Sequence, residues 1–177
     1  YNAIVAPTTS EEGHEIWITE GTYTIGAVLS TKSYIKIYGG FKGTESVTTE
    51  REKGDAPWIF TNPTVLDANN LTGVLNSRGS RSGVIIDGIT ACNVKGGRGI
   101  IMRGSEMVQN CIIENVDGGN GTKGGGVFFY KGGNMKNSLI RNNKSGNGGG
   151  IAFLQVNEAT SVVENCVIEN NTITDGK

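Results

Sequence analysis

The chain has 177 residues, of which 28 are glycine, 16 are basic and 17 are acidic, and its net charge is −1. Glycine is roughly twice as frequent as the usual share of about 7%, and Ile and Val far outnumber Leu and Ala. This composition disfavours helices and excludes a helical bundle, a coiled coil and most α/β enzymes. The 36% of apolar residues and the low net charge exclude disorder, and three prolines exclude collagen. An all-β protein with many tight turns remains.

The N-terminal third of the chain predicts short strands and one long loop. Alternating apolar residues predict strands at 15–19, 21–25 and 33–38. Gly39 and Gly40 predict a turn after the last of them. The charged segment 42–62 predicts a surface loop with a helical turn at 49–53, and we expect the apolar residues 58–60 to fix this loop against the body of the protein.

A repeat organises the rest of the chain. Segments 108–116, 135–143 and 163–171 align, and their marker asparagines are spaced 27 and 28 residues apart. Two earlier segments, 64–67 and 84–90, fit the same register with aspartate at the marker. The complete marker column is Asp67, Asp87, Asn110, Asn137 and Asn165. We interpret it as a structural ladder at a tight corner, because Asn and Asp tolerate left-handed backbone and can hydrogen-bond to stacked equivalents.

A unit of 20–28 residues with two or three short strands cannot bury its own apolar side and must stack on its neighbours. The sequence therefore predicts a right-handed, single-stranded parallel β-helix. We expect one domain over 1–177, with N-terminal rungs at 13–66 that include the loop 42–62, and regular rungs at 67–177. Both ends of the sequence resemble cuts through a longer solenoid, so we expect further rungs or a partner chain there.

Alternation along the repeats assigns side chains to the inside or the outside. The columns expected inside are Gly88, Cys111, Ser138 and Cys166, and Thr90, Ile113, Ile140 and Ile168. The column expected outside is Ala91, Glu114, Arg141 and Glu169, which allows charge pairing between rungs. The three cysteines, including Cys92, read as small core residues and not as a disulfide or zinc site.

Several segments carry a resemblance to known proteins. Segments 15–24, 35–41 and 62–67 resemble secreted right-handed β-helix proteins of Bacteroidetes-type bacteria, which have the pectate-lyase-like superfold. Segment 142–151 resembles the repeats of chlamydial polymorphic outer-membrane proteins and related adhesins. The resemblance covers about residues 13–177. It implies an extracellular or bacterial cell-surface location, associated with the outer membrane.

The β-helix superfold hosts pectate lyases, polygalacturonases, epimerases, tailspikes and adhesins, so the site must decide the function. The single histidine, His14, lacks the Gly-His-Gly and paired aspartates of a polygalacturonase-like site. A lyase would need clustered carboxylates for calcium and a basic side chain on the same face. Asp67 and Asp87 are the weak catalytic candidates for such a site. The basic residues near them in sequence are Arg78, Arg81, Arg98 and Arg103.

Two surfaces are candidates for binding. The residues two positions after the marker, Ile89, Ile112, Leu139 and Val167, are predicted to form an external aliphatic stripe. Either a partner covers this stripe, or loops of the same chain cover it, or a bend at the corner turns it inward. Phe128, Tyr130 and Leu154 project to one side of their strands, and with Lys131 they predict a shelf on which a sugar ring could stack.

The sequence thus favours a non-enzymatic extracellular or cell-surface module that binds a glycan or a protein in the manner of an adhesin. One alternative is a polysaccharide lyase or glycoside hydrolase that acts on an acidic polysaccharide, with calcium as the cofactor of a lyase; otherwise no cofactor or metal is expected. A further alternative is a structural component of a larger surface assembly. The balanced charge argues against nucleic acid as a partner, and no apolar run reaches the roughly 18–20 residues that span a bilayer.

Overall fold

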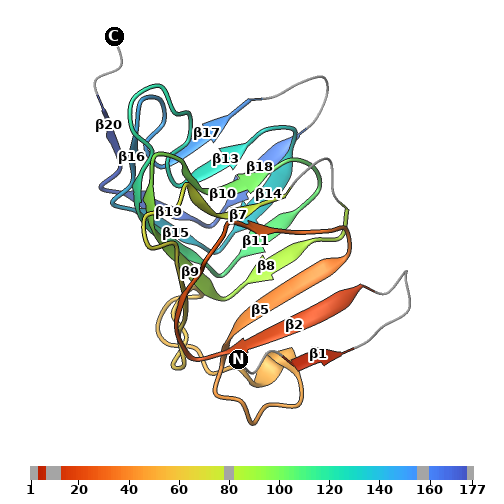
Figure 1. Cartoon of the computed structure of the whole chain (residues 1–177). Coiled ribbons are helices and arrows are strands. Elements are labelled where there is room, and N and C mark those ends of the chain that lie inside the picture. Colours follow the sequence, from red (N-terminus) through yellow and green to blue (C-terminus); the bar gives the residue numbers. More distant parts are fainter. Residues whose placement is uncertain (1–3, 7–12, 78–81, 155–159, 175–177) are drawn as a thin grey trace.

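The computed structural model describes residues 4–6, 13–77, 82–154 and 160–174. Its strands wind into a solenoid with three stacked sheets, and the early strand β2 and the late strand β20 lie at opposite ends (Figure 1). The described residues contain no α-helix and therefore none that is long and apolar enough to cross a membrane. The predicted right-handed, single-stranded parallel β-helix is confirmed.

Each sheet collects one strand from each turn of the solenoid. Sheet A consists of β1 (Ile4–Ala6), β2 (His14–Thr19), β5 (Ile35–Phe41), β8 (Ile85–Asp87), β11 (Met107–Gln109), β14 (Gly133–Lys136) and β18 (Ser161–Glu164). Sheet B consists of β3 (Gly21–Thr24), β6 (Thr64–Asp67), β9 (Ile89–Lys95), β12 (Ile112–Asp117), β15 (Leu139–Arg141) and β19 (Val167–Glu169), with β16 (Lys144–Ser145) and β20 (Thr172–Ile173) beside its path. Sheet C consists of β4 (Leu29–Ser30), β7 (Gly73–Asn76), β10 (Arg98–Met102), β13 (Val127–Phe129) and β17 (Ile151–Phe153).

Consecutive rungs pair in parallel, as the repeat predicts. In sheet A, Ile86 pairs with Val108, Val108 with Met135, and Met135 with Val163. In β11, β14 and β18 these side chains alternate with exposed or half-buried neighbours, which is the period of two that a strand imposes, whereas in β8 the neighbour Asp87 is itself buried. The strand β1 is an addition that the sequence did not predict, and it pairs antiparallel with β2.

The predicted turn at Gly39 and Gly40 is wrong, because β5 continues through both glycines to Phe41. Both are required by close packing and not by a reversal of the chain. A Cβ on Gly39 would lie 2.5 Å from the carbonyl oxygen of Gly88, and Gly40 has a φ of 87°. The loop 42–62 follows and contains a short 3₁₀ helix, η1 (Thr48–Glu50), close to the predicted helical turn.

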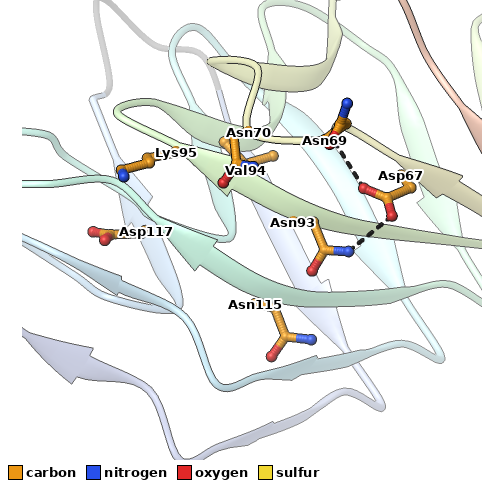
Figure 2. A pocket seen from close by; sticks show the side chains of 8 residues that line it. All are labelled: Asp67, Asn69, Asn70, Asn93, Val94, Lys95, Asn115 and Asp117. Atoms are coloured by element: carbon orange, nitrogen blue, oxygen red, sulfur yellow. Dashed lines mark hydrogen bonds between the residues drawn. The ribbon is translucent and has the colours of Figure 1, made fainter.

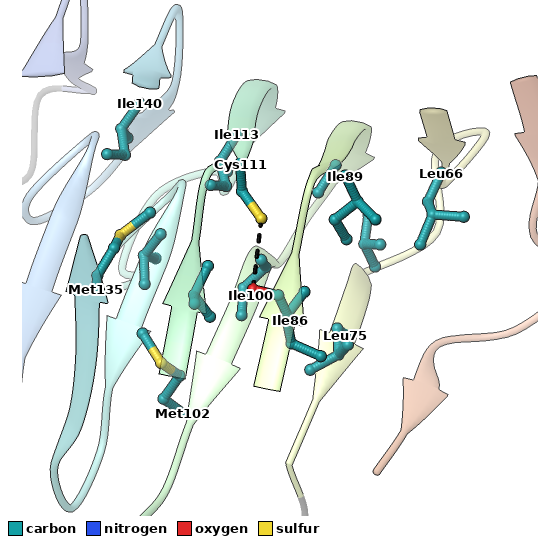
Figure 3. Close-up of a cluster of buried hydrophobic side chains, with 14 of the residues drawn as sticks. Leu66, Leu75, Ile86, Ile89, Ile100, Met102, Cys111, Ile113, Met135 and Ile140 are labelled. Carbon is teal, nitrogen blue, oxygen red and sulfur yellow. Dashed lines mark hydrogen bonds between the residues drawn. The ribbon is translucent and has the colours of Figure 1, made fainter. Parts of the chain in front are cut away.

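The core runs along the solenoid axis and takes apolar side chains from all three sheets (Figure 3). Cys111, Ser138, Ile113 and Ile140 are fully buried, which confirms their predicted inward orientation. Ile168 was predicted to be inside as well but is 51% exposed, because it belongs to the last described rung and no described strand packs over it.

Asparagines with left-handed backbone mark the corner between sheets A and B. Asn110, Asn137 and Asn165 have φ values of 54°, 51° and 50°. The interpretation of these three residues as corner residues is confirmed. Asparagine suits such a position because its short polar side chain tolerates the left-handed region better than most L residues do.

Candidate functional site

The two predicted aspartates of the marker column do not lie in it. Asp67 ends β6 in sheet B, where it pairs with Cys92, whereas Asp87 ends β8 in sheet A, where it pairs with Gln109. In the rung of Asp87, the left-handed residue is Gly88, with a φ of 74°. The predicted register is therefore wrong by one residue in that rung, because a glycine fills the position that asparagine fills in the later rungs.

Because of this one-residue error, the first member of the predicted outward charge column is also wrong. Cys92, and not Ala91, pairs with Glu114. The predicted charge pairing is present in the next rung, where Nε of Arg141 lies 2.7 Å from Oε2 of Glu114.

Asp87 is enclosed by hydrogen-bond donors. Its Oδ1 accepts hydrogen bonds from Nη1 of Arg51 at 3.1 Å and from Nδ2 of Asn110 at 2.9 Å, and its Oδ2 accepts one from Nε2 of Gln109 at 2.7 Å. The side chain is only 4% exposed. A buried carboxylate with these partners is suited to holding the loop and the corner in place, and it has no open side for a substrate or a metal ion.

Asp67 is half-buried at the end of β6 in sheet B. Its Oδ1 accepts a hydrogen bond from the backbone N–H of Asn69, and its Oδ2 accepts one from Nδ2 of Asn93 at 2.9 Å. Because Asp67 and Asp87 lie on different sheets, they do not converge as the calcium-binding pair of a lyase would. Within the described part of the chain, no group of three or more His, Cys, Asp or Glu side chains is placed to hold a metal ion.

The first member of the predicted external aliphatic stripe lies in the core. Ile89 is 2% exposed and packs in the core, so its predicted external position is wrong. The cause is the same register error: Thr90, and not Ile89, pairs with Ile112. Ile112, Leu139 and Val167 do stack in register on sheet B, but Leu139 is only 7% exposed, so the predicted external position is wrong for it as well.

The loop 42–62 reaches the beginning of this stripe. Trp58, Ile59 and Phe60 line a hollow of about 260 Å³ together with Thr90 and Ile112. Phe60 is buried, which agrees with the predicted fixing of the loop by residues 58–60. A loop of the chain therefore borders the stripe at one end, while Val167 at the other end is exposed.

The predicted aromatic shelf lies on sheet C and is covered by cations. The guanidinium of Arg98 lies 4.3 Å from the ring centroid of Phe128, and that of Arg103 lies 4.7 Å from the ring centroid of Tyr130. Phe128 is consequently only 5% exposed. The ammonium of Lys131 lies 5.8 Å from the Tyr130 ring. Contacts of this kind are attractive because a cation is stabilised by the negative face of an aromatic ring.

The sequence predicts Arg98 and Arg103 only as possible bases of a lyase, and it does not predict their position over the shelf. Arg98 and Arg103 take part in none of the ion pairs found among the described residues. Burial, and then the charge of the nearby Arg103, lower the pKa of the Arg98 guanidinium. Nε of Arg103 is held by Oδ1 of Asn76 at 3.3 Å. We name Asn76, Arg98, Arg103, Phe128, Tyr130 and Lys131 the basic-aromatic face. Leu154 adjoins it and is partly exposed, and Arg78 and Arg81 lie outside the described residues.

A second column of left-handed asparagines, which the sequence analysis missed, divides sheet B. Its members are Asn93, Asn115, Asn142 and Asn170, with φ values of 58°, 56°, 55° and 53°. Each follows the first corner residue of its rung by five positions, so the signal was present in the repeat itself. Figure 2 shows Asn93 and Asn115 on neighbouring strands, with Lys95 and Asp117 further along the same strands.

The side chains of this second column line an open groove. Its first part has a volume of about 440 Å³ and extends from Asp67 to Asp117. A second part of about 380 Å³ continues from Asn115 to Asn170 and Thr172. The two parts share Asn115 and Asp117, and the groove therefore runs across the rungs, along the solenoid.

The comparisons with known proteins agree with this architecture. The family model described as rhamnogalacturonase A/epimerase, pectate lyase-like, matches residues 1–176. Neither the search of curated proteins nor the search of solved structures found a significant match. With a three-sheet parallel β-helix and a match over nearly its whole length, the chain belongs to the pectate-lyase-like family of rhamnogalacturonase A and epimerases.

Proposed function

We propose that the protein is a non-enzymatic, extracellular or cell-surface module that binds an acidic polysaccharide through the basic-aromatic face of sheet C. The observation that carries this proposal is the placement of Arg98 and Arg103 side by side over two aromatic rings, without a carboxylate partner among the described residues. Two guanidinium groups that repel each other are stabilised by an anion. A guanidinium also binds a carboxylate in a planar, two-bond arrangement.

The cations change how the predicted shelf would work. Phe128 is covered by Arg98 and is not free to stack on a sugar ring. The rings instead hold the guanidinium groups in place, and the guanidinium groups meet the uronate carboxylates of the ligand. Tyr130, which is half-buried beneath Arg103, and Lys131 extend the same face, and we expect the Tyr130 hydroxyl and the Lys131 ammonium to hydrogen-bond to the sugar.

The location proposed for the module is the bacterial cell surface. Its resemblance to secreted β-helix proteins and to adhesin repeats supports this location, and so does its membership of a family named for enzymes of polysaccharides. The role as an adhesin rests on the same resemblance. The pairing of Asp87 with three donors, and its separation from Asp67, favour binding over cleavage.

The test compares polygalacturonate binding by the wild type and by Arg98→Gln/Arg103→Gln in isothermal titration calorimetry. We expect affinity at least about tenfold lower in the double variant, since two charge-assisted contacts are lost. Wild-type affinity should also fall as salt is added. The control is Arg141→Gln, which removes a cation from sheet B. Equal binding by the wild type and the double variant would contradict the proposal.

The alternative function, a lyase or hydrolase for acidic polysaccharide, is favoured by the family match. It is tested on the same samples by following unsaturated ends for a lyase and new reducing ends for a hydrolase. Turnover by the wild type that Asp67→Asn abolishes, with unchanged stability, would replace the binding function with this one.

A further inference from the structure

Three of the four residues in the second asparagine column, described above, have side chains that the fold does not use for hydrogen bonding, while Asn93 donates to Asp67. The amides of Asn115, Asn142 and Asn170 make no hydrogen bond to another described residue. All three are exposed. Their left-handed backbone explains why the position avoids most L residues, but glycine would satisfy it equally well. The amide groups themselves therefore remain available to a ligand.

The opposite wall of the groove is a column of charges in register. Lys95 pairs with Asp117, and Asp117 pairs with Lys144 along the sheet. Nζ of Lys144 lies 3.0 Å from Oδ2 of Asp117. Together with Asp67 on the first wall, the groove has two cations and two carboxylates, so it presents no net charge to a ligand.

The spacing of the amides is set by the solenoid. Neighbouring strands of a sheet lie about 4.8 Å apart, so one amide, with both a donor and an acceptor, recurs at that interval. The length of one sugar ring in an extended polysaccharide is close to this interval. A chain that runs along the solenoid axis would meet an equivalent amide at each ring.

We propose that this groove is a second binding site, separate from the basic-aromatic face, and that it binds a neutral, extended polysaccharide lying parallel to the solenoid axis. The amides of Asn115 and Asn142 exchange hydrogen bonds with hydroxyl groups of successive sugar rings. Val94 and Val116 lie at the floor of the groove, but their side chains are buried in the core, so the surface that the groove offers to a ligand is polar. The groove has no net charge to offset the cost of desolvating a uronate carboxylate, so it favours an uncharged sugar, in contrast to sheet C.

The test uses Asn115→Gly/Asn142→Gly, which removes both amides while glycine keeps the left-handed backbone without strain. The matched control is Asn137→Gly/Asn165→Gly, which makes the same change at the first corner, where φ is 51° and 50°. The probes are cellohexaose, mannohexaose and xylohexaose, with a galacturonate hexamer as the acidic probe. Binding is measured by isothermal titration calorimetry on the full chain.

We expect the wild type and the control variant to bind at least one neutral probe, and the groove variant to bind it about tenfold or more weakly, as the loss of two hydrogen bonds predicts. Binding of the acidic probe should be unchanged in the groove variant. Failure of the wild type to bind any neutral probe, or equal binding by the groove variant, would overturn the inference. Neither result bears on the basic-aromatic face, which Arg98→Gln/Arg103→Gln tests separately.

Discussion

Nη1 of Arg51 lies 3.1 Å from Oδ1 of Asp87, and both side chains are almost fully buried, with exposed fractions of 7% and 4%. This ion pair joins the loop 42–62 to the end of β8. The same Nη1 donates to the carbonyl oxygen of Gly39, and the guanidinium lies 5.0 Å from the ring centroid of Phe60. Asp87, which the sequence predicts as a catalytic candidate, thus anchors a surface loop.

The substitution Asp87→Asn should strongly destabilise the fold. It leaves the buried guanidinium of Arg51 without its counter-charge, which costs about 3–5 kcal/mol in the free energy of unfolding. Urea denaturation followed by circular dichroism measures the change. The control is Asp117→Asn, which breaks the more exposed pair with Lys144 and should cost only about 0–1 kcal/mol. Similar losses in the free energy of unfolding in the two variants would show that the Arg51–Asp87 pair stabilises the fold no more than the exposed Lys144–Asp117 pair does.

The first corner column allows a separation of backbone from side-chain effects. Asn137 has a φ of 51°, so Asn137→Ala should lower the free energy of unfolding by about 1–2 kcal/mol, the cost of holding an ordinary L residue in the left-handed region. Asn137→Gly should leave it nearly unchanged, since glycine adopts this region freely. Thermal melts of both variants are the measurement. If the glycine variant is as unstable as the alanine variant, side-chain hydrogen bonding stabilises the corner instead.

The repeat determined the fold, because a period of 20–28 residues with alternating apolar positions permits few other ways to bury a core. It placed Cys111, Ser138 and Ile113 correctly, since alternation is a property of each strand alone. The repeat alignment failed at Asp87 and Gly88. Asparagine and glycine can both occupy the left-handed corner, and the alignment assigned the corner to Asp87 instead of Gly88. Because of this single error, Ile89 was predicted at the surface, whereas the structure places it in the core.

The site was harder to predict than the fold. Alternation put Phe128 and Tyr130 on the correct face, but it could not show that Arg98 and Arg103 cover them, because those residues lie a full rung earlier and reach the rings through long flexible side chains. The second asparagine column recurs in the sequence five residues after the first corner residue of each repeat, so a second marker at that spacing predicts it.

A buried asparagine inside the solenoid should be essential. Nδ2 of Asn143 donates to the carbonyl oxygen of Ile113 and to Oδ1 of Asn171, and its own Oδ1 accepts from the N–H of Val116, each at 3.0 Å. Asn143→Ala leaves two buried backbone groups unpaired, each at a cost of about 1–3 kcal/mol. We expect a loss of several kcal/mol in urea denaturation. Asn142→Ala, the neighbouring exposed residue, is the comparison and should lose only the backbone term of about 1–2 kcal/mol.

The thiol of Cys111 should make stability depend on pH above neutrality. Burial raises the pKa of this thiol to about 12 and that of Cys92 to about 11, whereas an unfolded cysteine ionises near pH 8.5. Because the folded pKa is the higher one, the contribution to stability is complete below about pH 8.5 and is lost as the pH rises toward the folded value.

Between about pH 9 and pH 11, ionisation of Cys111 in the unfolded chain should therefore reduce the free energy of unfolding by about 1.4 kcal/mol per pH unit. The substitution Cys111→Ala removes this term while leaving every tyrosine and lysine in place, so the difference in slope between variant and wild type isolates the thiol. Urea denaturation at a series of pH values measures both slopes. Parallel slopes would mean that the Cys111 thiol ionises as readily in the folded protein as in the unfolded chain.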